Sequence, residues 1–255
     1  MDELELLDKL KGTFVADLMG AIIPGAIHNF ANPLNGLTGR IKLLEMHLSK
    51  AVQAVEPIQP GLSSEHPLDK ISRDVDILTD ESERLLDLFR NFEGKIMALF
   101  SGEQEMLDLA ELIKAEVKFA DYYLDLKHDV SKTLRVDGDI PLVLGNRAGY
   151  SLCLSSLINF ARLRLKNVSE KKLDISVSCD DDGIKIMIQD SGERISEACN
   201  KIAAENGFGD EARTATDSGC VFSLLLLKMY GFQTAVDFRE GRNIVLLAKP
   251  YKTAN

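Results

Sequence analysis

The sequence predicts an all-α helical hairpin followed by an α+β domain, and three observations support this fold class. Apolar residues follow helical spacing up to about residue 100. Beyond that point, short stretches of alternating apolar and polar residues, typical of strands, are interspersed with helical ones. A cluster of Pro, Gly and Ser between residues 57 and 67 separates the two helical runs. We therefore expect two domains, residues 1–100 and residues 101–255.

The first helical run has apolar residues spaced alternately by three and four positions, as in helices that pack at a shallow angle. They are Ile27, Phe30, Leu34, Leu37, Ile41, Leu44 and Leu48. A second run keeps this spacing from Ile71 to Ile96, with Ser82 as the only polar residue in register. A single hairpin leaves apolar flanks in water, so we expect two copies to form a dimeric four-helix bundle. Alternatively, the stripe packs on the chain's own second half.

The second half predicts a sheet with helices on one face. After a linker at residues 101–105, the pattern indicates helices at 107–123, 152–165 and 221–230, the last ending at Gly231. A strand is expected at 130–136 and a strand pair at 234–238 and 244–247. Residues 173–179 and 184–188 alternate on either side of the turn Asp181-Asp182-Gly183, which predicts a β-hairpin.

Composition places the protein among globular proteins of the cytoplasm. The chain has 255 residues, 45% of them hydrophobic and 27% charged. Its net charge of −10 argues against nucleic-acid and anionic-membrane partners. No stretch approaches the roughly 20 apolar residues of a membrane span, and the first residues lack a signal peptide. The cysteines show no metal-binding or redox spacing, which indicates reduced thiols; they are Cys153, Cys179, Cys199 and Cys220.

His28 is the first candidate for chemistry. It follows a seam residue, so its ring is expected at the open edge of the bundle. Pro33 lacks an N–H and crowds the carbonyl of Asn29, which should loosen the helix beside His28. A neutral imidazole nitrogen is a competent nucleophile toward a phosphoryl group. We interpret the other histidines, His47, His66 and His128, as ordinary helix or loop residues.

Four motifs in order resemble those of two-component sensor histidine kinases. The string HNFANPL from His28 to Leu34 resembles the phosphoacceptor box, and Leu157 to Arg162 resembles the asparagine box. Ile188 to Gly192 is similar to the first glycine box, and Asp217 to Leu224 to the last. The resemblance covers about residues 14–250. It implies a dimerisation and phosphoacceptor hairpin followed by an α+β sandwich of the Bergerat ATP-binding type.

The resemblance also implies roles for single residues, with ATP and Mg²⁺ as cofactors. Asn159 matches the Mg²⁺ ligand, and Arg162 a basic residue that neutralises phosphate charge. Asp190 matches the acceptor of the adenine amino group, Gly192 lets the base approach, and Gly219 leaves helix amides free for phosphates. Simpler interpretations remain open: Asn159 as a capping or core amide, Asp190-Ser191-Gly192 as a plain turn, and Gly219 as a plain helix lead-in.

The residues that depart from the family pattern are at positions expected to take part in catalysis or nucleotide binding. Asn29 replaces the acid that usually follows the phosphoacceptor histidine, and an amide accepts no proton at neutral pH. Arg194, Asp217 and Val221 stand where glycines are usual, which disfavours nucleotide binding. The stretch from Arg194 to Ser218, with Gly207 and Gly209, matches the lid. Asn32, one turn after His28, matches the residue that orients water for dephosphorylating a partner aspartate, or is a surface or kink-bonding amide.

Three functions stay open on the sequence. The first is a cytoplasmic histidine kinase that phosphorylates His28 from ATP and passes the group to an aspartate on the receiver domain of a response regulator. The second is a histidine phosphotransferase, or a pseudokinase, with a degenerate nucleotide domain. The third is a dimeric helical scaffold. Because Met1 to Lys11 is too short to fold as a sensor, we expect any signal to arrive through a separate sensor protein or through concentration alone.

Overall fold

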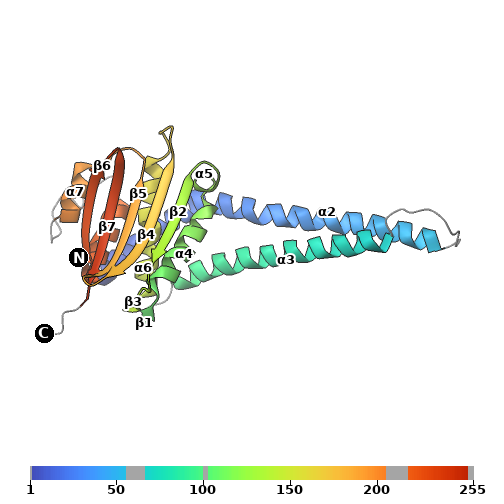
Figure 1. Cartoon of the computed structure of the whole chain (residues 1–255), viewed down its shortest axis with the longest axis horizontal. Coiled ribbons are helices and arrows are strands. Elements are labelled where there is room, and N and C mark those ends of the chain that lie inside the picture. The colour runs from blue at the N-terminus through green and yellow to red at the C-terminus, as the bar shows by residue number, and fades with distance from the viewer. Residues whose placement is uncertain (1, 56–66, 100–102, 205–217, 252–255) are drawn as a thin grey trace. The chain divides into compact units, whose positions relative to one another are not determined.

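The structure is a computed structural model that describes residues 2–55, 67–99, 103–204 and 218–251 (Figure 1). The chain divides into two compact units. One comprises residues 24–93, and the other comprises residues 1–23 together with 94–255. The predicted order, a helical hairpin followed by an α+β domain, is confirmed.

The smaller unit is an antiparallel hairpin of α2 (Ile23–Val55) and α3 (Pro67–Ala98) (Figure 1). Phe30 stacks on Phe89 across the hairpin, with ring centroids 4.5 Å apart. Farther along, the buried Asp74 accepts a hydrogen bond from Arg40, and Nδ1 of His47 lies 2.7 Å from its other carboxylate oxygen. The helix α2 runs through Pro33 without a break. The predicted connection between the runs falls mostly in residues 56–66, outside the described residues.

The predicted apolar seam of α2 splits into two columns. Phe30, Leu37 and Leu44 are half-buried. The alternate residues are exposed by 47–64%; they are Ile27, Leu34, Ile41 and Leu48. Such a column of large apolar side chains at a seven-residue repeat is typical of a helix face that meets another helix.

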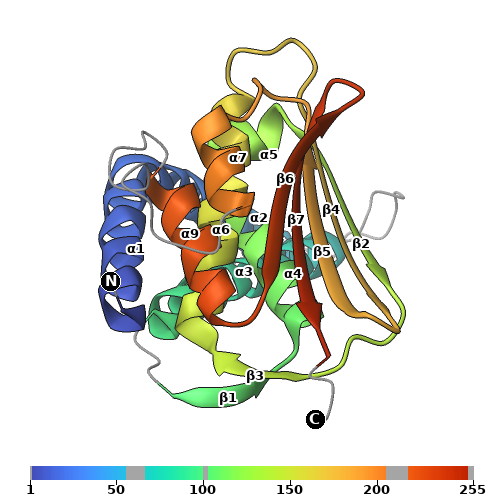
Figure 2. The same ribbon diagram turned by 90° about the vertical axis from the view of Figure 1, so that its left-hand side faces the viewer.

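The larger unit is built on a five-stranded mixed sheet in the order β2-β4-β5-β7-β6 (Figure 2). These strands are β2 (Ser131–Asp137), β4 (Lys172–Asp180), β5 (Gly183–Asp190), β6 (Gln233–Arg239) and β7 (Arg242–Pro250). The strand β2 is parallel to β4, and all other neighbours are antiparallel. Gly183 has a φ of 138° in the β4–β5 turn, a conformation that favours glycine. The predicted β-hairpin and C-terminal strand pair are therefore confirmed.

Helices cover one face of this sheet, as predicted (Figure 2). They are α4 (Leu109–Phe119), the short η2 (Ala120–Tyr122), α5 (Leu124–His128), α6 (Arg147–Arg164), α7 (Glu197–Ala204) and α9 (Ser218–Met229). Burial alternates along β4 and β7, because every second side chain faces the helix layer. The core therefore lies between the sheet and α6 and α9.

Several element boundaries differ from the prediction for local reasons. The expected linker and the start of the expected helix at 107 are instead β1 (Gln104–Leu107), which pairs with β3 (Val143–Asn146) in a small antiparallel sheet. The helix begins only at Leu109 because Asp108 caps it by accepting a hydrogen bond from the amide of Glu111. Similarly, Asn146 caps α6, which therefore starts before residue 152.

The N-terminal residues differ most from the prediction. Asp2 caps the helix α1 (Glu3–Asp17), and the π-helical segment η1 (Leu18–Ile22) joins α1 to α2. The helix α1 packs on α6 and α9 (Figure 2). Its buried side chains are Leu6, Leu7, Leu10 and Phe14. Residues 1–23 therefore belong with the α+β unit, whereas the sequence assigned them to the helical domain.

The continuous helix from Glu3 to Lys50 is long and apolar enough to cross a membrane by length and composition, contrary to the expectation from sequence. Among the described residues it is the one helix that meets this test, which core helices of soluble proteins also meet. Its first turns bury Leu6 and Leu10 completely within the α+β unit.

Candidate functional site

The predicted phosphoacceptor segment lies in α2, within the hairpin unit. His28 and Asn32 are both exposed and lie one turn apart, so they share a helix face. Asn29 points elsewhere and is 4% exposed, and Pro33 is also buried. The imidazole of His28 is therefore accessible to a partner, with the Asn32 amide beside it. Their chemical roles stay predictions.

Both polar atoms of the predicted metal ligand, Asn159, already form hydrogen bonds with neighbouring side chains. Its Nδ2 donates a hydrogen bond to Oδ2 of Asp17 at 2.6 Å, and its Oδ1 accepts one from Nε of Arg162 at 2.8 Å. Arg162 in turn pairs with Asp125 at 2.9 Å and lies over the ring of Tyr123. Burial raises the pKa of the Asp17 carboxyl, and the charge of Arg162 partly opposes this. Here Asn159 has the bonds of a core amide.

This arrangement does not fit Mg²⁺. The one oxygen of Asn159 faces a guanidinium, whose positive charge repels a cation, and its amide nitrogen is not a metal ligand. Within the described ranges, no group of three or more His, Cys, Asp or Glu side chains is placed to hold a metal ion. The cavity beside Asn159 has a volume of about 120 Å³, with Thr13, Asp17 and Gly219 in its wall. Ligand pockets usually measure about 300–1,000 Å³.

The predicted adenine acceptor, Asp190, is 0% exposed at the end of β5. Its Oδ2 accepts a hydrogen bond from Nη2 of Arg164, with which it forms an ion pair. Its Oδ1 accepts hydrogen bonds from the amide of Gly192 at 3.0 Å and from Nδ2 of Asn243 at 2.9 Å. Both carboxylate oxygens therefore already bond donors of the chain itself.

Gly192 lies where the end of β5 comes close to the backbone of α6. A Cβ at this position would lie 2.7 Å from the carbonyl carbon of Arg164, which is too close for any side chain. The small residue thus makes room for the end of α6 in this structure. Asn243 adds hydrogen bonds to the carbonyls of Gly192 and Glu193, and so fixes the same turn.

Gly219 lies in the first turn of α9, and no contact with the described residues requires a glycine there. A Cβ there would lie 3.5 Å from Cγ2 of Thr13, an ordinary contact. Val221 is completely buried in α9. Of the predicted lid, residues 205–217 lie outside the described residues, with Asp217, Gly207 and Gly209 among them.

Sequence reasoning missed Arg164, Asn243 and the buried cluster around Lys95. Nζ of Lys95 bonds Oε2 of Glu116 and Oγ of Ser151, each at 2.7 Å, and it lies 5.0 Å from the ring centre of Phe14. Burial lowers the pKa of Lys95, and Glu116 opposes this. A lysine within a helical pattern carries no sign of burial, so only the tertiary fold reveals this pair.

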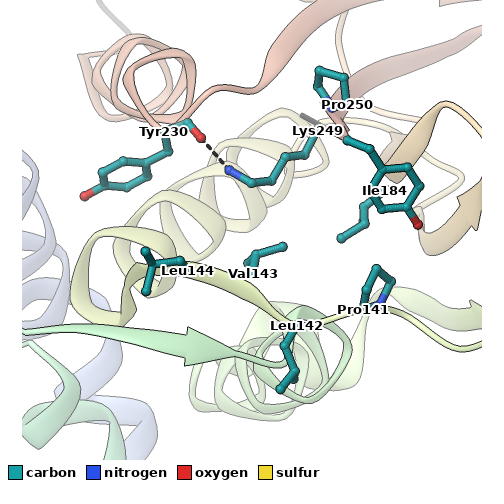
Figure 3. Close-up of a pocket in the computed structure, with 9 residues that line it drawn as sticks. Pro141, Leu142, Val143, Leu144, Ile184, Tyr230, Lys249 and Pro250 are labelled. Atoms are coloured by element: carbon teal, nitrogen blue, oxygen red, sulfur yellow. Dashed lines mark hydrogen bonds between the residues drawn. The ribbon is translucent and has the colours of Figure 1, made fainter. Parts of the chain in front are cut away.

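A larger cavity of about 450 Å³ lies at the opposite end of β5 from Asp190 (Figure 3). Its wall is mostly apolar and includes Leu142, Leu144 and Ile184. Lys249 crosses it and donates a hydrogen bond to the carbonyl oxygen of Tyr230. None of the site residues predicted from the sequence lines this cavity.

Known proteins resemble this chain in structure but do not match it in sequence. No family model matches the chain, and no curated protein matches its sequence. Among solved structures, the catalytic domain of histidine kinase ThkA is 17% identical with a TM-score of 0.48, covering 58% of this chain and 95% of that one. In structure, this chain is similar to histidine kinases. The histidine kinase AdeS of Acinetobacter baumannii is 16% identical with a TM-score of 0.46. The matched region covers 85% of this chain and 98% of the AdeS chain. A bacterial phosphotransferase is 11% identical with a TM-score of 0.39, and the matched region covers 91% of this chain and 96% of that one.

Proposed function

We propose that this protein is a histidine phosphotransfer protein with a histidine-kinase-like architecture. His28 accepts a phosphoryl group from the aspartyl phosphate of one receiver domain and donates it to an aspartate of another, without ATP. We favour phosphotransfer over ATP-dependent phosphorylation because the Asp190 carboxylate is wholly buried and paired with Arg164.

Energetics explain why this pairing opposes adenine binding. An adenine amino group would have to reach a wholly buried carboxylate that already accepts hydrogen bonds from Arg164, Gly192 and Asn243. If the amino group displaced Arg164, the buried carboxylate would lose its counter-ion at a cost of about 3–5 kcal/mol. A new hydrogen bond to a charged group returns only about 1.5–3 kcal/mol. The chain's own ion pair is therefore favoured over the nucleotide.

The phosphate end of the site supports the same conclusion. Asn159 is bonded to Asp17 and Arg162, and Arg162 is held by Asp125. A nucleotide triphosphate would bring further negative charge toward Asp17 and Asp125, into a cavity of about 120 Å³. Like charges at short range repel, so this part of the site also disfavours ATP.

The chemistry at His28 needs no nucleotide. A neutral imidazole nitrogen attacks the phosphorus of an aspartyl phosphate, a P–N bond forms, the P–O bond to the aspartate breaks, and the free carboxylate leaves. The imidazole loses its N–H proton to solvent, and the reverse sequence on a second receiver domain returns the group to an aspartate. Exposure of His28 on α2 permits this exchange. We assign Asn32 the orientation of water at the partner's aspartate.

We further propose that the active form is a homodimer in the cytoplasm. The exposed column of apolar residues at a seven-residue repeat supports a dimer interface; it consists of Ile27, Leu34, Ile41 and Leu48. Two hairpins that join along this column would form the predicted four-helix bundle. Receiver domains are then the partners.

The kinase and the phosphotransfer protein are distinguished by the source of the phosphoryl group. The full-length protein is incubated either with labelled ATP and Mg²⁺ or with a receiver domain phosphorylated by acetyl phosphate. We expect acid-labile, alkali-stable label only from the receiver domain, and none on the His28→Ala variant. His128→Ala, which removes another exposed histidine, serves as the matched control. Label from ATP on His28 would instead establish the kinase.

A further inference from the structure

The cavity at the end of β5 opposite Asp190 is open and mostly apolar (Figure 3). Its volume of about 450 Å³ lies within the range of about 300–1,000 Å³ that is usual for ligand pockets. Leu142, Val143 and Ile184 give its wall aliphatic side chains. Such a cavity is large enough to enclose the apolar body of a small molecule.

Lys249 brings a positive charge to this apolar wall. Its side chain lies across the cavity, and its ammonium donates hydrogen bonds to the carbonyl oxygen of Tyr230 and, at 3.2 Å, to the hydroxyl of Tyr150. Both of these acceptors are uncharged, so neither of them neutralises the ammonium. Among the described residues, the wall contains no acidic side chain. A cation with apolar surroundings attracts an anion more strongly than a cation in water does.

Aromatic rings hold the Lys249 ammonium in position. It lies 4.9 Å from the ring centre of Phe232 and 5.9 Å from that of Tyr150, within the range of a cation–π interaction. Tyr150 in turn stacks on Tyr230, with ring centres 4.9 Å apart. A side chain that is already fixed loses little conformational freedom when it meets a ligand, which favours affinity.

The donors of the cavity limit the kind of anion that it can bind. Pro141 and Pro250 have no backbone N–H, so this part of the wall offers no amide donors. Lys249 is the one cationic side chain that the described part of the wall contains. A phosphate group carries a charge of about −1.5 to −2, which exceeds that of one ammonium. A carboxylate carries a single negative charge and therefore matches the cavity better.

Exposed apolar side chains extend this wall toward the solvent. Leu142 and Leu144 line the cavity, and each is more than half exposed. Met106 is opposite Leu144 in the β1–β3 ladder, lies on the same face and is also more than half exposed. Contiguous exposed apolar side chains often mark a binding site. A ligand with an apolar body would remove some of this surface from water, which favours binding.

We propose that this cavity binds a small monocarboxylate with an apolar body, such as a medium-chain fatty acid. The carboxylate pairs with the Lys249 ammonium, and the hydrocarbon chain lies against Leu142, Val143 and Ile184. The proposal does not depend on phosphotransfer through His28, because it concerns a site within the α+β unit.

Isothermal titration calorimetry of the full-length protein tests this site with octanoate and with 1-octanol, an uncharged molecule of equal chain length. We expect octanoate to bind at one site per chain and 1-octanol to bind at least about tenfold more weakly, because the alcohol carries no charge for the ammonium. Lys249→Met keeps an apolar side chain but removes the charge. This variant should bind octanoate about tenfold or more weakly than the wild type, with binding of 1-octanol unchanged.

A second variant keeps the test decisive if Lys249→Met fails to fold. Leu142→Glu changes an exposed side chain of the wall and repels a carboxylate, so it should also weaken octanoate binding by about tenfold or more. The matched controls lie outside the wall and should leave binding unchanged: Lys172→Met in β4 and Leu163→Glu in α6, both at exposed positions.

Three results would overturn the proposal. The first is the absence of octanoate binding to the wild type at about 10 mM. The second is equal affinity of the wild type for octanoate and 1-octanol, since the cation would then select nothing. The third is octanoate binding that is as tight in folded Lys249→Met, or in Leu142→Glu, as in the wild type, because the ligand would then bind elsewhere.

Discussion

Among single residues, Arg164 and Asp190 form the contact on which the choice between kinase and phosphotransfer protein depends. They lie at the ends of α6 and β5 and are 8% and 0% exposed. The Arg164 guanidinium also lies 3.8 Å from the ring centre of Phe160, which leaves little space around the carboxylate. In this pair, Arg164 neutralises the Asp190 carboxylate, which in the family motif accepts the adenine amino group.

Removing the Arg164 side chain should therefore destabilise the protein strongly. In Arg164→Ala the Asp190 carboxylate stays buried without its counter-ion, and we expect the free energy of unfolding to fall by about 3–5 kcal/mol. Urea denaturation measures this change. Arg194→Ala removes an exposed arginine nearby and should change stability by less than about 0.5 kcal/mol. An equally small effect of Arg164→Ala would show that the pair does not hold Asp190.

The helical relation between His28 and Asn32 can be predicted from the sequence, whereas the contacts of the Asp190 carboxylate cannot. His28 and Asn32 share a helix face because helical spacing alone determines that relation. The state of Asp190 depends instead on Arg164 and Asn243, which are 26 and 53 positions away in the chain. A local motif carries no information about such contacts, so the engagement of Asp190 and Asn159 appears only in the folded structure.

Among the helices and strands, the long periodic ones were predictable and the tertiary assignment of α1 was not. The alternation in β4 and β5 identifies a half-buried hairpin directly. The strand β3 has only four residues and is too short to show a pattern. The apolar residues of α1 are compatible with packing on either unit, and the sequence offers no means to choose between them.

The contact of α1 with Asn159 predicts a pH dependence. The pKa of Asp17 is raised from 3.8 by burial, so the folded state binds this proton more tightly than the unfolded state does. Stability then falls as the pH rises above 3.8 through the raised pKa, because ionisation is disfavoured only in the folded protein. Among the described residues, Asn159, Arg162 and Tyr123 face Asp17, and Asp125 pairs with Arg162.

Comparison with Asp17→Asn isolates this contribution. We expect the free energy of unfolding of the wild type to decrease relative to that of Asp17→Asn as the pH is raised from about 4 to 7. Denaturant titrations at several pH values measure the difference. In Asp8→Asn, which changes an exposed aspartate of the same helix, the difference should stay constant. A wild type that gains stability over Asp17→Asn with rising pH would show that Arg162 outweighs burial.

The assembled protein depends on the exposed apolar column of α2. Burying one isoleucine or leucine side chain stabilises an assembly by about 1.5–3 kcal/mol. In a two-fold interface each residue is buried once in each subunit, so its contribution counts twice. Four such residues per chain supply a substantial driving force for association. The net charge of −10 opposes close approach in general but does not prevent it at a face that is locally apolar.

Charge placed in this column should separate the subunits. We expect the wild type to sediment as a dimer and the double variant Ile41→Glu, Leu48→Glu as a monomer. In a dimer of the variant, both subunits would bury these glutamates without an opposite charge, which is costly. Analytical ultracentrifugation measures the mass of both. Lys42→Glu changes an exposed residue beside the column and should remain a dimer. A wild type that is monomeric, or a double variant that is dimeric, would contradict the proposed bundle.

The most direct test of the proposed function is the modification state of His28 under two phosphoryl donors. The full-length protein is incubated with acetyl-phosphate-loaded receiver domains from its own organism and, separately, with ATP and Mg²⁺, and is analysed by mass spectrometry at neutral pH. The proposal predicts a phosphoryl group on His28 from at least one receiver domain and none from ATP. Phosphorylation of His28 by ATP, or by none of the donors, would contradict it.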